Sequence, residues 1–118
     1  MQQDERGFRI AVVADELVNP ATAGFDVLKV LERAGWGAIV LPPGWYPGEV
    51  LAELRMQFAE QVEEFVRHGY QVVCVGNCEA LAEPLAHLGV NMPESVIASD
   101  GRKLSGFLRR RRAAASGA

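Results

Sequence analysis

Cysteine and long apolar runs are both scarce in this chain. Two cysteines occur among 118 residues. Cys74 and Cys78 are too close in sequence for a useful disulfide staple, which fits a reducing compartment. No apolar run approaches the ~20 residues that a membrane-spanning helix needs. Residues 1–6 are polar and do not read as a signal peptide. These absences predict a cytoplasmic protein with no membrane segment.

The motifs that would identify a single chemistry are also missing. The sequence contains no Gly-x-x-x-x-Gly-Lys phosphate loop and no histidine, cysteine and aspartate cluster with metal-ligand spacing. We therefore predict no metal site. Residues 14–19, which follow the first apolar run, contain no glycine. A dinucleotide-binding turn needs glycines there, and flavodoxins cradle the FMN phosphate on a Ser/Thr/Gly-rich loop at the same place. The cofactor is unknown from the sequence.

Three short apolar runs, each ending in a turn before a helix-period stretch, dominate what is present. They cover residues 8–14, 37–41 and 70–76. This alternation is typical of a parallel sheet whose strands are covered by helices on both faces. Helices are expected from Asn19-Pro20 to Gly35, over 49–68 and over 102–112, and a fourth strand over 94–98. Pro84 allows either one short turn over 78–82 or a helix that begins at the proline.

These elements predict a single α/β domain over residues 1–112, with 113–118 as a frayed C-terminal tail. Its fold class is a small, flavodoxin-like three-layer sandwich. The expected sheet has four parallel strands in the order 2-1-3-4, with helices on both faces. Half of a dinucleotide-binding sheet is the alternative, and the glycine-free turn after the first run counts against it.

Ligands of parallel sheets bind at the carboxyl ends of the strands, so the residues there are the candidate site. Asp15 and Glu16 would form its polar floor. Trp45 and Tyr46 sit in a proline-rich loop and could stack on a ligand ring. The third turn adds the last candidates, namely Gly76, Asn77, Cys78 and Glu79.

Cys78 and Asn77 are the candidate catalytic residues. A cysteine near a helix N-terminus gains thiolate character from the free N–H groups and the helix dipole. Cys78 would then act as nucleophile or acid/base, with Asn77 donating to a substrate oxygen. The alternative is that Cys78 only caps the helix.

Charge is distributed unevenly along the chain. Residues 1–101 hold 6 basic and 15 acidic residues, a net charge of −9, whereas 102–118 hold six basic residues and no acid. Arg109 to Arg112 form an unbroken basic run. The chain is acidic overall and lacks aromatic residues interleaved with this run, so we expect no nucleic acid partner but a solvated or self-docked tail.

Three functions fit these residues. We favour a domain that binds a small molecule, nucleotide or sugar-phosphate-like, because the polar groups form no complete catalytic constellation. The first alternative is a small enzyme that uses Cys78. The second is an oligomerising module built on the long helix and the basic C-terminal helix. For the binding domain and for the enzyme, the exposed sheet edges predict a homodimer.

Overall fold

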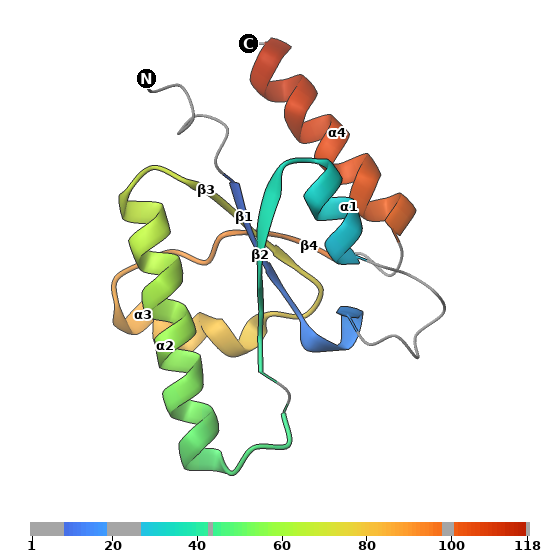
Figure 1. Ribbon diagram of the computed structural model, residues 1–118. Helices are drawn as coiled ribbons and strands as arrows, with labels where there is room; N and C mark the ends of the chain where they lie inside the picture. Colours follow the sequence, from blue (N-terminus) through green and yellow to red (C-terminus); the bar gives the residue numbers. More distant parts are fainter. Residues whose placement is uncertain (1–8, 19–26, 43, 98–100, 118) are drawn as a thin grey trace.

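The computed structural model describes residues 9–18, 27–42, 44–97 and 101–117. Figure 1 shows a central sheet with helices on either side. The strands are β1 (Arg9–Val13), β2 (Trp36–Val40), β3 (Gln71–Val75) and β4 (Glu94–Val96). The α-helices are α1 (Val27–Arg33), α2 (Gly48–Arg67), α3 (Ala82–His87) and α4 (Gly101–Gly117), and two 3₁₀ turns are η2 (Asp15–Val18) and η3 (Glu79–Leu81).

The predicted sheet is confirmed. Its strands are all parallel, in the order β2-β1-β3-β4. Arg9 at the start of β1 lies opposite both Trp36 and Gln71. At the other end of each strand, Leu41 and Ala14 continue the ladder by donating their N–H groups to Val13 and Val75. The sheet therefore has an amino rim and a carboxyl rim at which three strands start and stop together.

Alternate residues of the two central strands face opposite layers. Val12 and Cys74 point into one core cluster with residues of α2, η3 and α3. Ala11 and Val73 point into the other cluster, with residues of α1 and α4. Figure 1 shows the same division, with α2 and α3 on one side of the sheet and α1 and α4 on the other. This gives the three layers that the near-continuous apolar runs predict.

The helices agree with the sequence in type and differ at their ends. Asn19-Pro20, the expected start of the first helix, lies outside the described residues, as does residue 98. The structure combines parts of both alternatives for Pro84, since η3 is a short turn and α3 begins at Ala82, two residues before the proline. N–H groups in a first turn have no acceptor within the helix, so proline loses nothing there.

The C-terminal helix is longer than expected. α4 continues to Gly117, so residues 113–117 prolong the helix that was predicted to end at 112. Their fraying stays a prediction. Among the described residues, no helix has the combined length and apolar character that crossing a membrane demands.

Candidate functional site

A groove of about 310 Å³ lies at the carboxyl rim, where the sequence places the site. Its polar lining residues are Asp15, Glu16, Arg55 and Asn77. Asp15 and Glu16 open η2, directly after β1, and Leu17 N–H closes that turn on the carbonyl of Ala14 at 3.0 Å. The sheet thus brings together three of the predicted site residues from two different turns.

Arg55 is the lining residue that the sequence analysis missed. It reaches the groove from α2 and is half-buried. Its Nε is shielded from solvent and has no hydrogen-bond partner among the described residues. Arg55 follows Leu51 by four positions and precedes Phe58 by three, so it shares their sheet-facing side of the helix. That spacing was the available signal, although an arginine on a helix is usually taken to face solvent.

Asn77 has a structural task at the rim. Its Oδ1 accepts the backbone N–H of Glu79 at 3.2 Å, an Asx turn that leads into η3. The side-chain NH₂ group is not used by that bond, and the residue is exposed. Asn77 can therefore present two N–H donors to a ligand while its oxygen holds the turn.

Cys78 lies beneath the groove and does not line it. Its side chain is 3% exposed, and the thiol donates to the carbonyl oxygens of Val12 at 3.5 Å and Val75 at 3.4 Å. A buried thiol that donates to carbonyl oxygens cannot be reached by an electrophile without local opening. The catalytic role of Cys78 stays a prediction that this burial does not favour.

The two cysteines influence each other. The neighbouring thiol of Cys74 lowers the pKa of Cys78, against the burial that raises it. The contact with Cys78, followed by burial, raises the pKa of Cys74 far above that of a free thiol. Both residues are free and buried. The pair acts mainly as part of the core between β3 and the α2–α3 layer.

The remaining candidates are not among the residues that line the groove. The ring of Trp45 is 73% exposed and stacks on Tyr46, with the ring centroids 4.3 Å apart. Glu79 is exposed on η3. Gly76 has a packing reason to be glycine, because its φ is +85° and a Cβ would come within 2.7 Å of Leu17. Ligand contacts by these four residues stay predictions.

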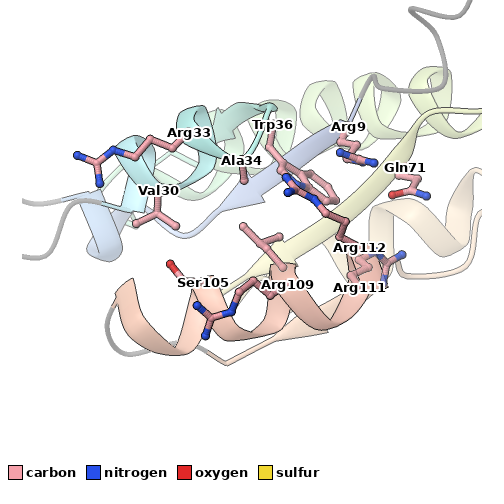
Figure 2. A pocket seen from close by; sticks show the side chains of 11 residues that line it. Arg9, Val30, Arg33, Ala34, Trp36, Gln71, Ser105, Arg109, Arg111 and Arg112 are labelled. Carbon is pink, nitrogen blue, oxygen red and sulfur yellow. The ribbon is translucent and has the colours of Figure 1, made fainter. Parts of the chain in front are cut away.

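A second cleft, of about 250 Å³, lies at the amino rim (Figure 2). Figure 2 shows that its side chains come from the starts of the strands, from α1 and from α4. Five of its lining residues are arginines, namely Arg9, Arg33, Arg109, Arg111 and Arg112. The guanidinium of Arg9 lies 5.9 Å from the ring centroid of Trp36, a cation–π distance. Nothing in the sequence analysis predicts this cleft.

One tail arginine is docked on the body of the protein. Arg111 forms an ion pair with Glu94 on β4, and its guanidinium carbon lies 5.9 Å from the centroid of the Phe107 ring. Of the two states expected for the tail, solvated or self-docked, Arg111 is in the second.

The fold and its depressions define a small parallel α/β domain with a groove at the carboxyl rim and a basic cleft at the amino rim. In the described ranges, no three histidine, cysteine, aspartate or glutamate residues gather as metal ligands would. No protein-family model matches the chain, and searches of curated proteins and of solved structures found no similar protein.

Proposed function

We propose that this chain is a binding domain for a small, hydroxyl-bearing molecule with one anionic group, such as a sugar phosphate, held in the carboxyl-rim groove. The observation that supports it is Arg55. The Nε–H of half-buried Arg55 is shielded from solvent and has no partner among the described residues, so this one N–H group has lost water without gaining a hydrogen bond. A phosphate or carboxylate would supply it, because guanidinium groups bind these anions through two parallel N–H bonds.

The other polar residues suit the remainder of such a ligand. The carboxylates of Asp15 and Glu16 accept hydrogen bonds from hydroxyl groups, and the free NH₂ of Asn77 donates to oxygen. Two carboxylates disfavour a ligand with several phosphates, so a single anionic group fits the charge balance. A volume of about 310 Å³ is near the lower limit for small-molecule sites, which run from ~300 Å³ upwards.

Binding without turnover is the better interpretation of this site. No described side chain in the groove pairs a nucleophile with a base, and the candidate thiol of Cys78 is buried below it. A nucleotide is less favoured than a sugar phosphate because no aromatic ring lines the groove in the described structure. A cytoplasmic location and a homodimer stay predictions, and light scattering of the purified chain checks the second.

The test is a thermal-shift screen with a panel of sugar phosphates, with the parent sugars as uncharged controls, followed by calorimetry. We expect the phosphorylated compounds alone to bind. Arg55→Gln should weaken binding tenfold or more, since a hydrogen bond to a charged group contributes about 1.5–3 kcal/mol. Arg67→Gln is the control, because Arg67 ends the same helix and pairs with Glu63 away from the groove. A panel that fails to bind, or equal affinity of the Arg55→Gln protein, overturns the proposal.

A further inference from the structure

We infer that the amino-rim cleft is a second ligand site, which binds a small compound with several phosphate charges, such as pyrophosphate or the polyphosphate chain of a nucleotide. The carboxyl-rim proposal does not use this cleft, and the two sites share no lining residue. The observation that carries the inference is the gathering of five arginines from three separate segments into one cleft.

The register of the sheet places Arg9 beside Trp36 and Gln71, and α4 packs close enough to add its own side chains to the cleft. Arg9 starts β1, and Arg33 ends α1. Ser105, Arg109 and Arg112 are spaced by four and three residues, so they lie along one side of α4. Figure 2 shows Trp36 and Gln71 beside Arg9 and Arg112 reaching toward Trp36, while the guanidinium group of Arg109 is directed away from them. Arg110, the run's remaining arginine, does not line the cleft.

The charge of the cleft has one sign. None of its described lining residues is acidic. Glu94, which is outside the lining, pairs with Arg111. In the described part of the chain, Arg33 and Arg109 have neither an ion pair nor a hydrogen bond. Arg111 and Arg112 are already engaged in interactions, so the binding of an anion would depend mainly on Arg9, Arg33 and Arg109.

The neutral lining residues indicate what kind of anion fits. Gln71 and Ser105 add hydrogen-bonding groups, and Leu108 and Trp36 are buried and form an apolar floor. Arg9 already covers the ring of Trp36, so that ring is not free to stack on a base. Recognition therefore depends on charge and on bidentate arginine contacts. A concave site of about 250 Å³ suits a short polyphosphate better than a nucleic acid strand, which needs a long basic track with stacking rings.

The experiment measures the binding of inorganic pyrophosphate to the full chain by calorimetry, with sodium sulfate at matched ionic strength as the reference anion. Three variants, Arg9→Gln, Arg33→Gln and Arg109→Gln, each remove one lining charge. Arg110→Gln and Arg102→Gln remove the same charge from α4 but outside the lining. We expect pyrophosphate to bind and to raise the melting temperature, each lining variant to lose about tenfold in affinity, and each control to lose less than about twofold.

Three results would overturn the inference. They are no binding of pyrophosphate, equal losses in lining and control variants, and a single-stranded oligonucleotide that binds more tightly than pyrophosphate through the same arginines. Circular dichroism checks that the variants fold. Arg55→Gln separates this site from the carboxyl-rim groove: it should leave pyrophosphate affinity unchanged, whereas Arg109→Gln should leave sugar phosphate affinity unchanged. The proposal for one site can therefore be refuted while the proposal for the other still holds.

Discussion

The two rims of the sheet collect their polar residues in different ways. At the carboxyl rim, two carboxylates follow β1 and one amide follows β3, and Arg55 joins them from α2. At the amino rim, the charged lining residues are all arginines. They come from the start of β1, the end of α1 and the C-terminal helix. The expectation that ligands bind at the carboxyl ends of the strands thus locates a groove. More charged residues line the cleft at the opposite rim.

Backbone geometry explains the difference. A turn that follows a strand is placed by the ladder itself, so its side chains reach the carboxyl rim whatever the helices do. The amino rim receives the ends of α1 and α4, which are placed only when their apolar sides, including Leu31 and Leu104, bury against the sheet. One site is therefore local in origin, and the other depends on the packed helix layer.

The largest effect should come from Gly76→Ala, which breaks the carboxyl rim. The φ of +85° disfavours any Cβ, and the added atom would lie 2.7 Å from Leu17 and 3.0 Å from Ala14. The Leu17 atom is the end of a flexible side chain that can move, whereas the Cβ of Ala14 is fixed to the backbone, so backbone strain and modest overpacking together should lower the free energy of unfolding by roughly 2–3 kcal/mol. Urea denaturation measures it.

Gly89→Ala is the matched control for that variant. Its φ is +76°, but an added Cβ would have no atom within 4 Å of it. It should therefore lose only the backbone contribution, about 1 kcal/mol. Pyrophosphate affinity at the far rim should persist in both folded variants. Equal destabilisation of the two proteins would show that the contact with Leu17 is not what requires a glycine at position 76.

A smaller effect is expected for the rate at which a reagent labels the two thiols. Because Cys74 and Cys78 are buried, a thiol reagent should label the native protein at least about a hundredfold more slowly than the urea-unfolded protein, equivalent to ~2.7 kcal/mol of opening. The time course of labelling with an aromatic disulfide at neutral pH measures this. Labelling of native Cys78 at the unfolded rate would instead support the enzyme alternative and sharpen the chemistry of the carboxyl rim.

The smallest effect, and the most informative for the amino rim, is expected from Glu94→Gln. Removing the carboxylate releases Arg111 and makes the cleft more positive, so pyrophosphate affinity should rise a few-fold. Stability should fall by at most about 1 kcal/mol, because the ion pair is partly exposed.

Glu63→Gln is the comparison, since it breaks the exposed pair with Arg67 on α2. It should cost a similar amount of stability and leave the affinity for pyrophosphate unchanged. A loss of pyrophosphate affinity in the Glu94→Gln protein would contradict the charge account of the cleft. Calorimetry and urea denaturation on the same samples give both quantities.

Periodicity in the sequence was sufficient to predict the strands, their parallel order and the turns at the carboxyl rim. A run such as 70–76 is buried on both faces only in a helix-covered sheet, so its pattern carries the architecture. Asp15 and Asn77 were found because they follow such runs directly. Arg55 was not predicted because the apolar pattern of a helix defines its sheet-facing side only to within one or two positions. A long side chain at the border of that side can also extend away from solvent.

Sequence alone determined that this chain is one parallel α/β sheet between helices, because burial of alternating residues depends on local order and period. Only the tertiary structure decided that Cys78 lies below the surface and that Arg9, Arg33 and Arg109 line one cleft. Those outcomes depend on the distances between segments that are far apart in the chain, and these distances are set by how the two helix layers pack on the sheet.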